Sequence, residues 1–254
     1  MAGRERRIRL DRLLVRRGLA ADRAEAEKLL ADNLVQVAGC VAPKATTLCP
    51  TDCHIALKKE QKSFVSRGGK KLAAALEAFS LDVRGVVCAD IGCSTGGFTD
   101  CLLQHGAARV YAVDVGYGVL DWKLRSDERV VVLERCNARF IGPEQVPEPI
   151  DLAVIDASFI SLELLIEPVM GLFRDRAVNI VALVKPQFEL KKEQIAPGGV
   201  VREEALQLQA LDKIRRCAQG LGLVCEGAIP SPIQGAKAGN QEYLLYMVAD
   251  SAAV

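Results

Sequence analysis

Five short apolar runs recur between residues 85 and 186, and they limit the folds open to this chain more than any other feature. Each run is rich in Val, Ile, Leu and Ala, and none alternates regularly with polar residues; they occupy residues 85–91, 108–115, 129–135, 150–157 and 179–186. Runs of this kind are typical of strands that are buried on both faces, as in a parallel sheet covered by helices.

Stretches with helical character lie between or beside these runs, at residues 68–79, 96–107, 161–173 and 203–222, and a last strand is expected at 241–250. This alternation of strands and helices predicts an α/β fold with a mostly parallel sheet.

The turn after the first run carries the sequence DIGCSTGGFTD, which starts at Asp90. It lacks the Gly-Lys-Ser/Thr ending of a phosphate-binding loop and does not match the Gly-x-Gly-x-x-Gly pattern of dinucleotide sites. Asp114 ends the next strand, 22 residues after Gly92, where a carboxylate can bind ribose hydroxyls. Asp90 itself favours a cation over a phosphate. These features indicate S-adenosylmethionine (SAM), although the glycines could instead only permit tight packing of strand and helix.

Two charged residues follow neighbouring strands of the predicted sheet. Asp156 ends the fourth run and Lys185 ends the fifth. Ligands of open α/β sheets bind at the carboxyl ends of the strands, and charges buried there need partners. Either residue alone could also be an ordinary surface residue.

The N-terminal quarter of the chain differs in charge from the rest. Residues 1–71 hold 16 Lys and Arg against 8 Asp and Glu, whereas residues 72–254 hold 17 against 24. Two short helices are expected before a hairpin at Gly39: one ends at Gly18, and the other is capped by Asp22 with Glu25 three residues later. A small basic module suggests a nucleic-acid partner, with a solvated lysine-rich surface as the alternative.

Other classes of protein are disfavoured. The chain has no run of about 18 apolar residues, as a membrane-spanning helix needs, and its basic start does not resemble a secretory signal. We therefore expect a cytoplasmic protein whose nine cysteines stay reduced. Cys49, Cys53 and His54 lack a second pair of ligands at zinc spacing, so no metal site is predicted.

Six motifs in a fixed order, SRGGKKL, DIGCSTGGFTD, DVGYG, DASFISL, LVKPQFE with PGGVV, and GNQEYLL, resemble the TlyA family of ribosomal-RNA 2'-O-methyltransferases, also labelled haemolysins. The resemblance covers nearly the whole chain. It implies an S4-like α+β RNA-binding domain over residues 5–57, a linker over 58–65, and a Rossmann-like SAM-dependent methyltransferase domain over 66–254. That domain would hold a mostly parallel seven-stranded sheet with helices on both faces, as in FtsJ-type enzymes.

The resemblance also assigns the site residues. The catalytic tetrad would be Lys71, Asp156, Lys185 and Glu242, with Lys70 as the alternative to Lys71. SAM would be held by Asp90, Gly92, Ser94, Thr95, Gly96, Gly97, Phe98, Asp114 and Asn137. RNA would be contacted by Arg12, Arg16, Arg17, Arg23, Lys44 and Arg67. Asn137 can equally be read as a polar turn residue.

The expected reaction needs a base that removes a proton from a ribose hydroxyl. A lysine can do this only in its unprotonated form, which burial and a second positive charge both favour. Lys185 is the candidate base. Lys71 would supply the second charge and hold a substrate phosphate, Asp156 would orient Lys185, and Glu242 would hold the lysines or the ribose.

The family's target is cytidine in ribosomal RNA. The chain stops soon after its last strand, which favours the large subunit as its substrate. Two other functions stay open: a non-catalytic RNA-binding factor in ribosome assembly, and a haemolysin or pore-forming protein. The sequence leaves the oligomeric state open.

Overall fold

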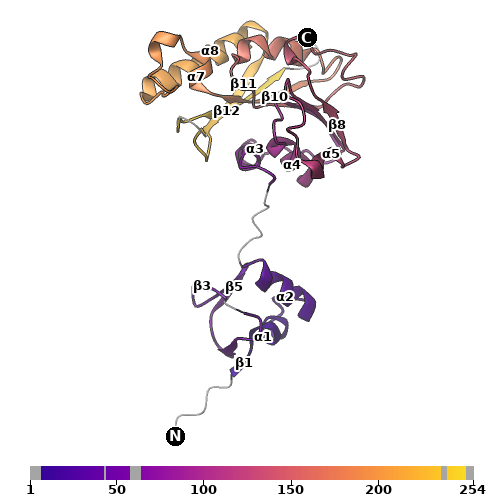
Figure 1. Ribbon diagram of the computed structural model, residues 1–254, viewed down its shortest axis with the longest axis vertical. Helices are drawn as coiled ribbons and strands as arrows, with labels where there is room; N and C mark the ends of the chain where they lie inside the picture. The colour runs from indigo at the N-terminus through magenta and orange to yellow at the C-terminus, as the bar shows by residue number, and fades with distance from the viewer. Residues whose placement is uncertain (1–6, 43, 58–63, 236–238, 250–254) are drawn as a thin grey trace. The chain divides into compact units, whose positions relative to one another are not determined.

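The computed structural model describes residues 7–42, 44–57, 64–235 and 239–249 of the chain, and Figure 1 shows their course. The chain forms two compact units, Met1–Ser63 and Phe64–Val254. The division falls in the stretch predicted as a linker, of which residues 58–63 lie outside the described residues. Phe64 and Val65 instead belong to the second unit, because both pack against its core and the Val65 N–H donates to Asp100 Oδ2 at 2.8 Å.

The N-terminal unit combines two helices with short strands. Its elements are β1 (Arg7–Arg9), α1 (Leu10–Arg16), α2 (Arg23–Ala31), β2 (Val35–Val37), β3 (Cys40–Val41), β4 (Leu48–Pro50) and β5 (Ile55–Leu57). β1 pairs with β4, and β2 pairs with both β3 and β5, all antiparallel. The expected helices and hairpin are confirmed, whereas β1 and β4 were not predicted.

Local chemistry explains the two helices of this unit. Gly18 follows α1 with a φ of +68°, a conformation that glycine adopts without strain. The Asp22 side chain caps α2 by accepting from the Glu25 N–H at 2.8 Å, as the capping pattern predicts. Leu10, Leu13 and Leu14 on α1 are fully buried in a small core of this unit.

The second unit is built on one seven-stranded sheet, with the strand order β11-β12-β10-β9-β6-β7-β8. Its strands are β6 (Val87–Ile91), β7 (Arg109–Val113), β8 (Val130–Leu133), β9 (Leu152–Ile155), β10 (Val178–Val184), β11 (Val224–Pro230) and β12 (Tyr243–Ala249). The pairs among β6 to β10 are parallel, whereas β12 runs antiparallel to both β10 and β11. This confirms the predicted fold class.

Helices cover both faces of the sheet, as Figure 1 shows for α8 on one face and α3 with α4 on the other. The helices are α3 (Gly68–Ala78), α4 (Gly97–Gln104), α5 (Trp122–Arg125), α6 (Ile166–Met170), α7 (Pro186–Glu189) and α8 (Glu204–Gly220), with 3-10 turns η1 (Ala138–Phe140), η2 (Leu162–Leu164) and η3 (Lys192–Gln194). One core joins the sheet to α6 and α8, and a second joins it to α3 and α4. Because both faces are covered, the strands need no polar alternation in their sequence.

The short helices α5 and α7 were not predicted, and two longer elements differ from the expectation. The helix predicted over 161–173 is divided into η2 and α6, and Pro168 within α6 cannot donate the N–H that a continuous helix requires. Strand β11 was not identified from the sequence. It is a half-exposed edge strand that contains Gly227 and ends at Pro230, so it lacks the apolar run that marks the inner strands.

Gly97 at the start of α4 sets the approach of α3. A Cβ there would overlap the Ser66 hydroxyl and lie 2.9 Å from the Gly69 nitrogen. We expect Gly97→Ala to lower the stability of the second unit by about 1–3 kcal/mol, since a packed backbone must move. Gly220→Ala, with no atom within 4 Å of the added Cβ, is the matched control and should cost nothing. Denaturant unfolding followed by circular dichroism measures both, and equal stability of the two variants would contradict this packing argument.

Candidate functional site

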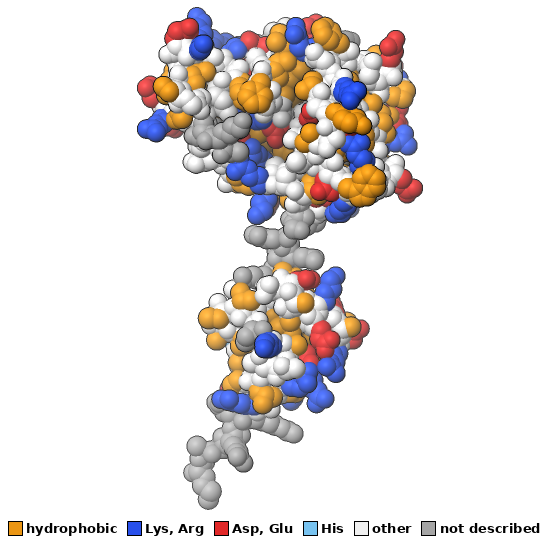
Figure 2. All heavy atoms as spheres, in the orientation of Figure 1, with side chains coloured by type: hydrophobic (Ala, Val, Ile, Leu, Met, Phe, Trp, Pro, Cys, Tyr) orange, Lys and Arg blue, Asp and Glu red, His pale blue; other side chains and the backbone are white. Residues whose placement is uncertain are grey.

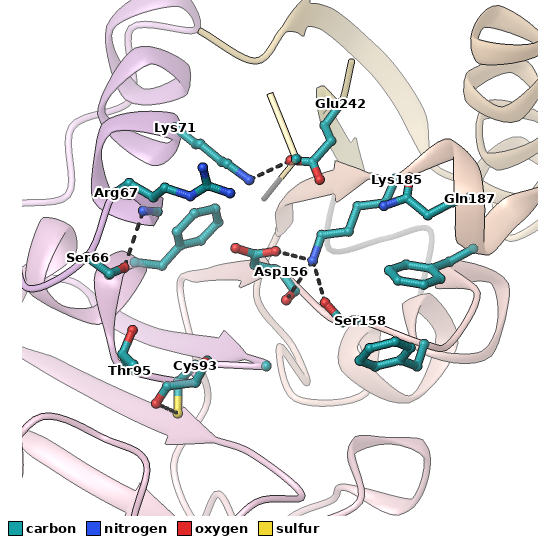
Figure 3. Close-up of a pocket in the computed structure, with 18 of the residues that line it drawn as sticks. Ser66, Arg67, Lys71, Cys93, Thr95, Asp156, Ser158, Lys185, Gln187 and Glu242 are labelled. Carbon is teal, nitrogen blue, oxygen red and sulfur yellow. Dashed lines mark hydrogen bonds and ion pairs between the residues drawn. The ribbon is translucent and has the colours of Figure 1, made fainter. Parts of the chain in front are cut away.

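A cavity of about 490 Å³ opens at the carboxyl ends of β6, β9 and β10, within the size range of small-molecule sites. Its walls come from the turn between β6 and α4, the start of α3, the ends of β9 and β10, and the segments around Gly199 and Glu242. Figure 2 shows a hollow on the second unit where acidic and basic side chains meet. Figure 3 shows the side chains that point into the cavity.

The glycine turn forms one end of this cavity. Gly92 has a φ of +83°, and a Cβ there would lie 2.9 Å from the Asp156 carbonyl oxygen. Gly92 therefore allows the turn to pass close to the end of β9. Of the predicted SAM residues, those lining the cavity are Asp90, Gly92, Ser94, Thr95, Gly97 and Phe98.

Asp90 is the most unusual residue of this turn. It is fully buried, its Oδ2 accepts from the Thr99 hydroxyl at 2.6 Å, and its Oδ1 has no partner among the described residues. Burial raises the pKa of Asp90 to about 7, opposed in part by the Thr99 hydrogen bond. An unpartnered carboxylate oxygen next to a cavity fits a ligand that brings a positive charge, such as the amino group of SAM.

Three predicted SAM residues, Gly96, Asp114 and Asn137, are not among the residues that line the cavity. Gly96 has a φ of +95°, and its missing Cβ leaves room for the Leu124 side chain. Asp114, at the end of β7, accepts from the Ser94 N–H at 2.8 Å and from the Gly116 N–H at 2.7 Å. It thus fixes the glycine turn, and each oxygen can still accept a further bond. Asn137 is exposed, and its side chain caps η1 by accepting from the Arg139 N–H at 3.1 Å. The predicted contact of Asn137 with SAM stays a prediction.

The four tetrad positions meet in the cavity as two ion pairs (Figure 3). Lys185 Nζ lies 2.5 Å from Asp156 Oδ1, and it donates to Ser158 Oγ at 2.9 Å. Lys71 Nζ lies 2.5 Å from Glu242 Oε2, and both of these side chains are less than 8% exposed. The pairing satisfies charges that would be costly to bury alone.

The topology explains why residues so distant in sequence come together. Strands β9, β10 and β12 are neighbours in the sheet, and Asp156, Lys185 and Glu242 lie at the same edge of those strands. Lys71 reaches this edge from α3. The adjacent Lys70 is exposed and does not line the cavity, so Lys71 is the lysine of this pair that the structure brings into the site.

Each lysine of this cluster has its own carboxylate, Glu242 for Lys71 and Asp156 for Lys185. The expected action of Lys71 on Lys185 as a neighbouring positive charge stays a prediction.

Several cavity residues were not predicted as site residues from the sequence: Ser66, Gly68, Cys93, Ser158, Phe159, Gln187, Phe188, Gly198, Gly199 and Gly235. Most of them lie within the quoted motifs, close in sequence to predicted site residues, and this closeness could have identified them as cavity residues. Phe159 is 81% exposed with a φ of +66°, a strained conformation for a bulky residue. Its ring lies 5.2 Å from the ring of Phe188, between centroids.

The predicted RNA-binding residues are all at the surface, and Figure 2 shows Lys and Arg side chains on the N-terminal unit. Arg12, Arg16 and Lys44 are exposed. Arg17 donates to the carbonyl oxygens of Thr51 and Cys53, and Arg23 pairs with Glu27. Arg17 and Arg23 therefore also stabilise the N-terminal unit.

Arg67 lies in the second unit, where its exposed side chain lines the cavity beside Lys71.

The sequence predicted reduced cysteines, no metal site and no membrane-spanning helix, and the described residues can be compared with these three expectations. All nine cysteines are free thiols. Within residues 7–42, 44–57, 64–235 and 239–249, no group of three His, Cys, Asp or Glu could hold a metal ion. No helix among those residues is both long and apolar enough to span a bilayer.

Comparison with known proteins gives consistent results. The FtsJ-like methyltransferase family matches residues 64–248. A Mycobacterium tuberculosis protein, the 16S/23S rRNA (cytidine-2'-O)-methyltransferase TlyA, is 47% identical over 243 residues, covering 95% of this chain and 90% of that protein. Hemolysin A of Brachyspira hyodysenteriae is 38% identical over 95% of this chain and all of its own length. A solved structure from Streptococcus thermophilus, described provisionally as a hemolysin, is 39% identical with a TM-score of 0.72, covering 97% of this chain and 90% of that one.

The buried Asp90 gives a test of the ligand end of the cavity. Because the folded-state pKa is raised to about 7 from 3.8, ionising Asp90 costs stability. That cost is absent at a pH below 3.8 and complete above about 7. Asp90→Asn keeps an acceptor for Thr99 and removes the charge. We expect this variant to melt higher than the native protein at pH 8, with a smaller difference at pH 5.5.

The same variant should bind SAM about tenfold to a hundredfold more weakly, because the charged acceptor for its amino group is lost. Thermal unfolding at the two pH values and calorimetric titration with SAM measure these effects. Unchanged SAM affinity would show that Asp90 does not face the ligand.

Proposed function

The chain belongs to the TlyA family of FtsJ-like methyltransferases, and from this premise we propose that it transfers a methyl group from SAM to the 2'-hydroxyl of a cytidine in ribosomal RNA. The observation that carries the proposal is the convergence of Lys71, Asp156, Lys185 and Glu242 on one cavity that continues into the glycine turn. A SAM site and a set of groups suited to a sugar hydroxyl therefore share one cavity.

SAM supplies an electrophilic methyl group when it is bound at the glycine turn. The unpartnered Oδ1 of Asp90 would accept from its amino group, and the turn from Gly92 to Phe98 would surround it. Asp114 would accept from the ribose hydroxyls while it keeps its bonds to the Ser94 and Gly116 N–H groups. The residues present thus fit the amino group and the ribose of this cofactor.

Lys185 is the proposed base. Its Nζ accepts the proton of the 2'-hydroxyl, and the ammonium that results is stabilised by Asp156 at 2.5 Å. Ser158 Oγ, at 2.9 Å, holds the same Nζ in place. Since Asp156 and Ser158 both bind this nitrogen, its position does not depend on the substrate. A hydroxyl aligned with it needs less activation free energy for methyl transfer.

Lys71 and Glu242 are the proposed substrate-positioning pair. Lys71 can still donate two hydrogen bonds beyond the one to Glu242, so it can hold a phosphate of the target nucleotide. Arg67 adds a second cation at the mouth of the cavity. Phe159 and Phe188 offer aromatic surface for a base that has been turned out of its helix.

The N-terminal unit is the proposed RNA anchor, an S4-like module that carries Arg12, Arg16, Arg17, Arg23 and Lys44. The 47% identity to a relative named for both 16S and 23S rRNA favours action on both subunits, in contrast to the expectation of the large subunit alone. Because ribosomes are assembled in the cytoplasm, we place the enzyme there.

The two other functions have less support. The support for a haemolysin comes from names alone, those of the Brachyspira relative and of the Streptococcus thermophilus structure, and leakage of dye-loaded liposomes would test it. A non-catalytic assembly factor would have no use for two buried lysine–carboxylate pairs in a cavity.

Replacing the proposed base tests the reaction directly. Lys185→Ala and Lys185→Arg should both lower methyl transfer to RNA by roughly 100- to 10,000-fold, because neither side chain can accept the hydroxyl proton. SAM affinity should stay near that of the native protein. Transfer of tritiated methyl groups and calorimetric titration measure the two effects. A Lys185→Arg variant with near-native turnover would mean that only the positive charge matters.

The salt dependence of RNA binding tests the N-terminal unit. We expect affinity for ribosomal RNA to fall steeply with salt concentration, since bound cations are released from phosphates. The double variant Arg12→Ala, Arg16→Ala should bind more weakly and reduce the log–log slope by about two. Arg84→Ala, an exposed arginine of the second unit paired with Asp82, is the control and should keep the native slope. A native slope near zero would contradict the proposed RNA anchor.

A further inference from the structure

Gln187 lines the cavity, two residues after Lys185, and its side-chain amide is held by a buried asparagine. Asn240 is only 2% exposed and donates from Nδ2 to Gln187 Oε1 at 3.0 Å. The same Nδ2 donates to the Gly199 carbonyl at 2.8 Å, and Asn240 Oδ1 accepts from the Val201 N–H at 2.8 Å. Asn240 thus joins three segments that surround the site.

The orientation of the side-chain amides of Asn240 and Gln187 follows from two backbone groups, the Val201 N–H and the Gly199 carbonyl. The Val201 N–H can only donate, so it must meet the oxygen of Asn240, and the Gly199 carbonyl can only accept, so it must meet the nitrogen. The second hydrogen on that nitrogen then points to Gln187, which must present its own oxygen. Turning either amide over would place like groups together, at the cost of buried unpaired polar atoms.

One consequence is that Gln187 Oε1 faces Asn240, so Nε2 is the end of the side-chain amide that is left to bind a ligand. No described residue accepts a hydrogen bond from Gln187 Nε2, and this atom is not a buried orphan. The Asn240 network therefore turns the oxygen of this amide toward Asn240 and leaves Nε2 as the end that can donate a hydrogen bond into the cavity.

Gln187 lies on the part of the cavity wall that the target base would face. Figure 3 shows it next to Lys185, on the side away from Cys93 and Thr95 of the glycine turn. If the 2'-hydroxyl lies at Lys185 Nζ with the methyl donor at the glycine turn, the base of that nucleotide extends to the other side. There, Phe188, Gly198 and Gly199 border the same space as Gln187.

We propose that Gln187 selects cytidine over uridine by donating a hydrogen bond from Nε2 to N3 of the base. In cytosine N3 is an acceptor, whereas in uracil N3 carries a hydrogen and would face the Gln187 donor. A buried site that is made for one partner rejects an analogue with the wrong hydrogen-bonding group. This inference rests on the proposed function, since it concerns the nucleotide that Lys185 would act on.

The test compares cytidine and uridine at the target position. Ribosomal subunits from cells without the enzyme are prepared with the native target cytidine or with uridine in its place, and kcat/KM for methyl transfer is measured on both. We expect the native protein to prefer cytidine by about tenfold or more. Gln187→Glu keeps an oxygen for Asn240 and replaces the donor with an acceptor, so it should prefer uridine.

A second variant and a control separate base selection from general damage. Gln187→Met removes the donor without adding an acceptor, and it should bring the preference close to one. Gln219→Glu, an exposed position on α8, makes the same chemical change elsewhere and should keep the native preference. The ratio between the two substrates is the readout because a loss of stability or of SAM binding would lower both rates together.

The outcomes also distinguish this inference from the proposed function. Transfer to cytidine by the native protein, with an unchanged preference in both Gln187 variants, would overturn the role of Gln187 and leave the proposed function intact. Equal native rates on cytidine and uridine would overturn it as well. Absence of transfer by the native protein to either substrate would overturn the proposed function, and the role of Gln187 with it.

Discussion

The contact between Lys185 Nζ and Asp156 Oδ1 joins the ends of two neighbouring strands at the floor of the cavity. A buried charge is costly unless a charge of opposite sign lies beside it. The parallel sheet brings Lys185 and Asp156 together because β9 and β10 end at the same edge. The pair of Lys71 with Glu242 repeats this arrangement between α3 and the start of β12. The sheet order therefore fixes the chemistry of the site, since it decides which charges can meet.

The two ends of the cavity offer opposite polarity. At the glycine turn, Asp90 Oδ1 is an acceptor without a partner, and at the far wall Gln187 Nε2 is a donor without one among the described residues. The first suits a cationic cofactor and the second suits an acceptor on a nucleotide base. Between them, Lys185 is held by Asp156 and Ser158, at the place where the two ligands would meet.

The sequence predicted much of this architecture because its signals are local. The inner strands β6 to β10 follow from apolar runs, and the cap at Asp22 follows from the spacing to Glu25. The edge strand β11 has no such signal. The pairing of each lysine with a carboxylate joins residues as far apart as Lys71 and Glu242, so no local pattern could indicate it. The orientation of Gln187 depends on Val201 and Gly199 through Asn240, which only the folded chain brings together.

A map of ribose methylation in ribosomal RNA, made from cells with this gene, without it, and with the gene restored, tests the central claim most directly. We expect one or more 2'-O-methylcytidines to vanish when the gene is removed and to return when it is restored. An identical methylation map in all three would contradict the assignment of this cavity to ribosomal RNA.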